Sequence, residues 1–254
     1  MKKIASILFL CLLIVSCNED NDDNISQVNI TFNFSHNWDG NAVSNANFNT
    51  IQYTNANGEE LSIEKLRYLI SKISFQNTNG ETFILEGYNL VDVTNNTNLG
   101  FVPITTIPVG DYSNVSFIFG FNNDDNYNNY PDLNSTSWNV PDMLGGGYHY
   151  MQLEGKFIDN TTTETGYAYH AIRAVNNSGT SPEFENTFFE VNLGEITITN
   201  NAVFNIEMNI AEWFKNPNTW NLNELNNMLM PNYDAQIMMY QNGQSVFSLK
   251  SIIQ

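Results

Sequence analysis

The chain contains three histidines, and each falls in a segment where apolar and polar residues alternate. His36 continues an apolar series, His149 alternates with Met151, and His170 alternates with Ile172. Because successive side chains of a strand point to opposite faces, this pattern predicts that all three imidazoles point into an apolar interior. A buried imidazole must hydrogen-bond, pair with a charge or bind a metal, since leaving it unsatisfied costs about 1 to 3 kcal/mol.

His149 and His170 lie on consecutive expected strands that a short turn could join into a hairpin. A two-residue turn at 159–160 would place the two histidines opposite each other, with Cβ atoms about 4.5 to 5.5 Å apart. A longer loop centred at 161–162 would place His149 opposite Ala174, and the imidazoles would then be about 13 Å apart. The first register allows a shared metal ion and the second does not.

Two imidazoles with a thioether or aromatic group nearby suit copper better than magnesium or calcium, which prefer oxygen ligands. We therefore take His149 and His170 as candidate copper ligands, with His36 as a third candidate and Met151 as an additional donor. The alternative is three separate core histidines, each bonded to a hydroxyl or a carbonyl group.

The segments that would position these residues predict an all-β fold. From Val28 onward, short alternating segments are separated by clusters of Asn, Gly, Asp and Thr, which is typical of an antiparallel sandwich or barrel. We expect a single antiparallel β-sandwich over 27–254, with one short C-terminal helix at 221–230 stopped by Pro231. Expected strands after the first are 51–54, 66–75, 82–85, 89–93, 114–121, 147–158, 166–175, 187–193, 202–210, 236–240 and 245–251. Tight turns are expected at Asn57-Gly58, Asn79-Gly80 and Asn242-Gly243.

The N-terminus predicts export and lipid attachment. Two lysines precede an apolar run at 4–15 that is too short to span a bilayer, and Ser16 then stands directly before Cys17. We expect a lipoprotein signal peptide at 1–16, lipid on Cys17 and an acidic flexible tether at 17–26. The protein would then be anchored to the outer membrane, facing the periplasm or the cell surface. Its folded part would contain no cysteine for a disulfide, a nucleophile or a thiolate metal site.

Composition excludes several classes of function. Nine basic residues against 27 acidic ones, a net charge of −18, argue against nucleic-acid binding. The chain has no Gly-x-Ser-x-Gly elbow, no phosphate-binding Gly-x-x-x-x-Gly-Lys and no His-Glu-x-x-His. Its 43 asparagines make a polar but mostly uncharged surface. We expect a binding protein and not an enzyme; a glycosidase would need a carboxylate pair that the sequence does not identify.

Five sets of short segments, taken in order, indicate a family. They are Phe34-Ser35-His36; 66–73; Leu90-Val91-Asp92; 107–112 followed by 117–120; and 147–155 followed by Tyr169-His170. Together they resemble the MbnP-like family, exported copper-binding proteins associated with methanobactin and with di-haem partners that oxidise a tryptophan. The resemblance implies an all-β sandwich, no catalysis of its own, copper on two histidines beside a modified tryptophan, and a di-haem oxidase-type partner.

One segment departs from the family pattern. Members usually carry Met-Phe-Trp-x-Trp just before the Gly-Tyr segment, and this chain has Met143-Leu144-Gly145-Gly146 there. Trp138 lies too far back to take the tryptophan's place by alignment. We therefore expect the fold to be shared more fully than the metal chemistry.

A second class of function competes with metal binding. Aromatic residues on a β-sandwich can form a platform that stacks against sugars, as in adhesion or glycan-binding modules. The candidates for such a platform are Tyr127, Tyr130, Trp138 and Tyr148.

Overall fold

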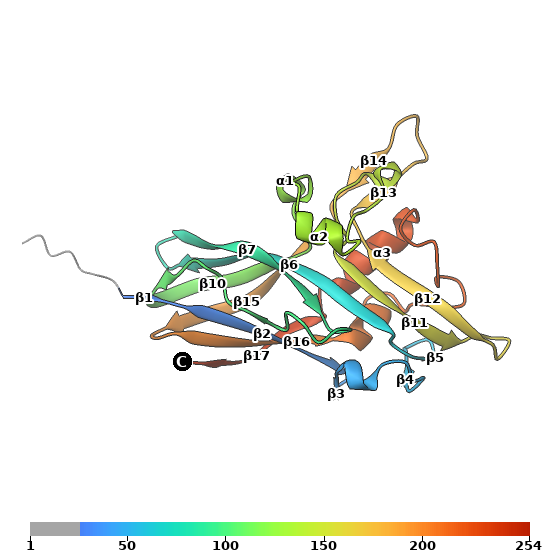
Figure 1. Ribbon diagram of the computed structural model, residues 1–254, viewed down its shortest axis with the longest axis horizontal. Helices are drawn as coiled ribbons and strands as arrows, with labels where there is room; N and C mark the ends of the chain where they lie inside the picture. The colour runs from blue at the N-terminus through green and yellow to red at the C-terminus, as the bar shows by residue number, and fades with distance from the viewer. Residues whose placement is uncertain (1–25) are drawn as a thin grey trace, which may run out of the picture.

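The computed structural model describes residues 26–254 (Figure 1). The expected signal peptide, Cys17 and all of the expected tether except Ser26 lie outside these residues. No helix in 26–254 combines the length and apolar character needed to cross a membrane.

The described chain folds into two main β-sheets with a common interior (Figure 1). The larger sheet contains β4 (Tyr53–Thr54), β5 (Glu60–Leu61), β6 (Lys65–Asn77), β7 (Thr82–Asp92), β10 (Gly110–Phe119), β11 (Met151–Ile158), β12 (Glu164–Ala171) and β15 (Phe189–Ile198). The smaller contains β2 (Ile30–Trp38), β3 (Asn41–Val43), β8 (Gly100–Phe101), β16 (Ala202–Asn209) and β17 (Phe247–Ile253). The expected all-β sandwich is confirmed.

Short elements complete the fold. Two further ribbons pair β1 (Gln27–Val28) with β9 (Ile107–Pro108) and β13 (Ala174–Asn176) with β14 (Glu183–Glu185). The α-helices are α1 (Asn123–Asn126), α2 (Pro131–Ser135) and α3 (Tyr233–Gly243), and the 3-10 helices are η1 (Asn45–Asn47), η2 (Asp142–Leu144) and η3 (Ile210–Phe214).

The main core lies between the two sheets and is rich in aromatic residues. Phe32 of β2 stacks on Phe204 of β16 with ring centroids 5.0 Å apart, and Phe75 of β6 meets Phe204 edge to face at 5.7 Å. These rings are almost completely buried. Apolar burial of this kind is the main stabilising contribution of a sandwich without disulfides.

A second, smaller core lies on the outer face of the larger sheet. It consists of Leu69, Phe121, Leu133, Trp138 and Tyr148. The segment 121–150, which carries α1 and α2, passes over β6 on the side away from β2 and β16 (Figure 1). Both faces of β6 are therefore buried, and the outer core places this segment beside the β11–β12 hairpin.

Three expectations about the elements are corrected. The sandwich is not purely antiparallel, because β2 and β16 pair in parallel, with Ile30 opposite Ala202. The C-terminal helix is α3, after Pro231, and not 221–230. Asn232 caps α3 by accepting from the amide of Ala235, so the helix begins directly after Pro231, the residue expected to end it. The expected strand 236–240 and turn 242–243 consequently belong to this helix. The other two expected turns, Asn57-Gly58 and Asn79-Gly80, do form, with positive φ at the glycine.

Gly155 of β11 tests how tightly the hairpin packs on the chain that enters β6. A Cβ at this position would lie 2.1 Å from the backbone oxygen of Ser62, which cannot move freely because the Ser62 amide donates to Lys156. We expect Gly155→Ala to lower the free energy of unfolding by about 1 to 3 kcal/mol, measured by urea denaturation. The matched control is Gly166→Ala in β12, where the nearest atom to a new Cβ is 3.9 Å away. Equal stability of the two variants would contradict the prediction.

Candidate metal-binding site

The register of the β11–β12 hairpin differs from both expected registers. A five-residue loop, 159–163, joins the strands and places Gln152 opposite His170 and Met151 opposite Ala171. The side chain of Asp159 holds this loop by accepting from the amides of Thr161 and Thr163. His149 lies just before β11, outside the regular pairing.

His170 does not point into the main core. Its neighbours Tyr169 and Ala171 are buried there, so alternation turns His170 to the outer face of the sheet. Its side chain is 17% exposed and shares this face with Gln152, its cross-strand partner, and Glu154. The expectation that all three imidazoles point inward is therefore wrong for His170, because the hairpin loop contains an odd number of residues. It is also wrong for His149, which does not share a face with Met151.

His149 reaches the same outer face through a break in alternation. Tyr150 and Met151 are consecutive, yet both are buried in the main core. His149 is consequently turned toward the outer core, where its ring centroid lies 5.6 Å from that of Trp138. The ring centroids of His149 and His170 are 5.2 Å apart at an interplanar angle of 84°. The two rings therefore lie close together, as the register with the two-residue turn would have placed them. The register that forms is a different one, and the break in alternation brings His149 to His170.

The backbone fixes the protonation state of His149. Its Nδ1 lies 2.9 Å from the carbonyl oxygen of Trp138, so Nδ1 donates a proton to this oxygen. Burial lowers the pKa of His149 to about 4, and the ring is neutral at pH 7. Nε2 then carries a lone pair. This atom is buried, and it has no hydrogen-bond partner within residues 26–254.

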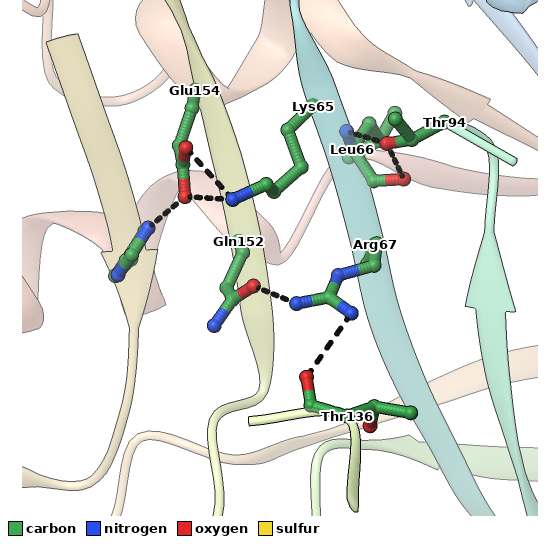
Figure 2. A network of polar contacts seen from close by, with 8 residues as sticks. Lys65, Leu66, Arg67, Thr94, Thr136, Gln152 and Glu154 are labelled. Atoms are coloured by element: carbon green, nitrogen blue, oxygen red, sulfur yellow. Dashed lines mark hydrogen bonds and ion pairs between the residues drawn. The ribbon is translucent and has the colours of Figure 1, made fainter. Parts of the chain in front are cut away.

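The tautomer of His170 is fixed by a carboxylate. Its Nε2 lies 2.8 Å from Oε1 of Glu154, which also accepts from Lys65 Nζ at 2.8 Å (Figure 2 shows the Lys65–Glu154 pair). The hydrogen bond from His170 lowers the pKa of Glu154 to about 2, outweighing the effect of burial with help from Lys65. An ionised carboxylate only accepts, so His170 donates through Nε2, which leaves Nδ1 as the nitrogen through which this ring could bind a metal.

The separation of the two rings is compatible with one shared metal ion. Two imidazoles bound to one ion have metal–nitrogen distances of about 2 Å. Their ring centroids are then about 4.5 Å apart at a nitrogen–metal–nitrogen angle of about 90° and about 6.3 Å apart at about 180°. The observed 5.2 Å falls within this range. The Trp138 carbonyl and the Glu154 carboxylate are the outer-shell partners that metal-binding imidazoles usually have. In the described part of the chain, no cluster of three or more His, Cys, Asp or Glu residues could hold a metal, so the pair stands without a third ligand of these types.

Arg67 of β6 covers the site from the side of the sheet. Its guanidinium carbon lies 5.0 Å from the centre of the Trp138 ring, and it donates to the side chain of Gln152 and the carbonyl of Thr136 (Figure 2). The cation–π contact and these hydrogen bonds fix the orientation of Trp138 relative to the sheet.

Sequence reasoning missed the position of Trp138. Asn139 and Tyr148 form an isolated antiparallel bridge, and the amide of His149 donates to the Trp138 carbonyl at 3.0 Å. Trp138 therefore lies beside His149 in space, although it is too distant in sequence to align with the family tryptophan. The glycine-rich turn at 145–147, with positive φ at each glycine, is the sequence signal that could have indicated this reversal.

The structure does not bring the other two proposed ligands to this pair. His36 is buried in the sandwich interior, where its Nε2 lies 2.9 Å from the hydroxyl of Tyr68. This interaction matches the alternative of a satisfied core histidine. Met151 is also buried in the main core, on the inner side of β11.

The aromatic platform expected for glycan binding does not form. Trp138 and Tyr148 are buried in the outer core, and Tyr130 stacks on Phe121 at 4.7 Å. Tyr127 is exposed, but a single ring is not a platform.

The fold and the site define a β-sandwich protein with an imidazole pair, His149 buried and His170 partly exposed, on the outer face of one sheet. The MbnP family model matches residues 27–234, and the chain belongs to this family. The solved structure of MbnP from Methylosinus trichosporium is similar with a TM-score of 0.50 and 12% sequence identity, covering 77% of this chain and 80% of that chain. At this identity the likeness shows a shared fold. No match is found among the curated proteins.

The buried neutral histidines predict a pH dependence of stability. Burial lowers the pKa of His36 from 6.5 to about 4. Between these values the unfolded chain binds a proton that the folded chain does not, so stability falls as the pH falls through this window, by roughly 3 kcal/mol for one such group. We expect metal-free His36→Gln to lose roughly 2 kcal/mol less than the wild type between pH 7 and 4.5 in urea denaturation. The same loss in both proteins would contradict burial of a neutral His36.

Proposed function

We propose that this chain is a non-catalytic copper-binding protein of the cell envelope, with the ion held by Nε2 of His149 and Nδ1 of His170. One observation carries the proposal. The buried Nε2 of His149 has its lone pair free of any partner in 26–254, and the second imidazole lies next to it. A buried nitrogen without a partner costs about 1 to 3 kcal/mol, and metal binding would remove this cost.

Each surrounding residue has a role in this proposal. Trp138 orients His149 through its carbonyl, and Glu154 orients His170 while Lys65 balances its charge. A bound copper ion would supply Lewis-acid and one-electron chemistry beside the Trp138 ring. The family resemblance supports this placement, because it implies two histidines and a neighbouring tryptophan. By the same resemblance, the proposed partner is a di-haem oxidase-type protein.

Copper titration tests the imidazole pair. We expect Cu(II) to bind the metal-free protein with nitrogen hyperfine coupling in electron paramagnetic resonance. His149→Ala and His170→Ala should each weaken binding by about tenfold to a hundredfold or more, because each removes one of two imidazole ligands. The matched control is His36→Gln, which removes a histidine from the sandwich interior and should bind as the wild type does. Equal Cu(II) affinity of all four proteins would refute the site.

Lipid attachment is a separate part of the proposal. It rests on the run 4–15 followed by Ser16 and Cys17, since the structure describes the chain only from Ser26. We expect Cys17→Ser to abolish incorporation of radiolabelled palmitate and to leave the protein out of the membrane fraction. Unchanged membrane association without label would show a different mode of anchoring.

A further inference from the structure

A pocket of about 460 Å³ adjoins the imidazole pair on the outer face. His170 is part of its wall, so the pocket and the proposed copper site share one residue. The other lining residues come from β12, from η2, from Asn177 and from the chain before α3; they are Met143, Leu144, Ala168, Asn177, Met228, Leu229, Met230 and Pro231.

Three of the lining residues are methionines, and two of them are exposed to an unusual degree. The exposed fraction is 81% for Met143 and 75% for Met228, while Met230 is partly buried. Other methionines of the chain, such as Met151 and Met208, are buried in the main core. Long apolar side chains gathered around one opening are typical of a binding surface.

The charge of the lining selects the kind of ligand. The chain has 27 acidic residues, yet none of the described residues lining the pocket carries a carboxylate, a lysine or an arginine. Calcium and magnesium need several oxygen ligands, which this lining does not supply. Thioethers and an imidazole are ligands that Cu(I) prefers.

Hydrogen bonds hold residues 228–230, the methionine segment, against β12, the strand that carries His170. The buried side chain of Gln236 donates to the carbonyls of both Leu229 and His170, at 3.0 and 2.8 Å. The amide of Ala168 donates to the carbonyl of Asn226 at 2.7 Å. Within this segment Met228 has a φ of +54°, a conformation that costs a residue with a Cβ about 1 kcal/mol or more. The strain persists because the segment is fixed on both sides of Met228.

We propose that this pocket is a Cu(I) site, with the thioether sulfurs of Met143, Met228 and Met230 as donors beside His170. The proposal rests on the proposed copper function and adds a second site next to the imidazole pair, since His170 is part of the pocket wall. It concerns binding alone and requires no redox step.

Replacement of sulfur without loss of apolar volume tests the proposal. In the double variant Met143→Leu/Met228→Leu, both positions are exposed, so folding should be unaffected. We expect the anaerobic Cu(I) affinity, measured by competition with a chromogenic Cu(I) chelator, to fall by about tenfold or more. The Cu(II) signal of the imidazole pair should be unchanged. The matched control is Met238→Leu on α3, a partly buried methionine outside the pocket that should bind Cu(I) as the wild type does.

The outcomes separate this inference from the proposed function. His149→Gln should lose the Cu(II) signal and retain Cu(I) binding with sulfur scattering in X-ray absorption. The thioether site would be overturned if the double leucine variant bound Cu(I) as tightly as the wild type does, or if bound Cu(I) showed no sulfur scattering. Either result would leave the imidazole pair standing. Unchanged Cu(I) affinity of the double leucine variant is the result expected if the pocket instead docks an apolar side chain of a protein partner, because leucine preserves the apolar lining. Sulfur-bound Cu(I) in a wild type that shows no Cu(II) nitrogen coupling would refute the imidazole pair but not the Cu(I) site.

Discussion

The geometry of the site depends on the two hydrogen bonds that His149 donates to the Trp138 carbonyl, one from its amide and one from Nδ1. These bonds fix the position of the ring and its tautomer together, so that Nε2 keeps its lone pair. They also place the Trp138 ring beside the imidazole. Without the bridge between Asn139 and Tyr148, His149 would continue the alternation of β11 and point into the main core.

The charges around the pair favour a positioning role for Glu154 in the proposed site over a role as ligand. One of its oxygens accepts from both His170 and Lys65, and the other also accepts from Lys65. A metal ion would have to displace these partners, whereas Nε2 of His149 has no hydrogen-bond partner in the described structure. Lys65 and Arg67 both come from β6 and lie on the outer face, so two of the nine basic residues of a chain with a net charge of −18 flank this site.

Local patterns predict the strands and turns well but predict poorly what depends on register or on distant segments. Alternation identified β2 and the inward His36, and two Asn-Gly pairs formed the expected turns. The hairpin loop could not be predicted, because Asp159 stabilises it through side-chain bonds that period-2 counting does not include. Only one of the two expected registers placed the imidazoles together, and neither register forms. The rings meet because an odd-numbered register shift and a break at Tyr150 each turn a side chain to the other face. Trp138 was missed for the related reason that the turn before Tyr148 brings together residues eleven positions apart.

The location of the pair on the outer face follows from how a sandwich fills its interior. Rings such as Phe32, Phe75 and Phe204 pack closely between the sheets, and His36, the histidine of this interior, already bonds to Tyr68. The outer face is covered by 121–150, whose Phe121, Leu133, Trp138 and Tyr148 belong to a core separate from the one between the sheets. The likeness to the solved MbnP structure at 12% identity is accordingly a likeness of the sandwich fold. The sandwich fold positions the sheet, and the segment that covers the sheet determines which chemistry can occur there.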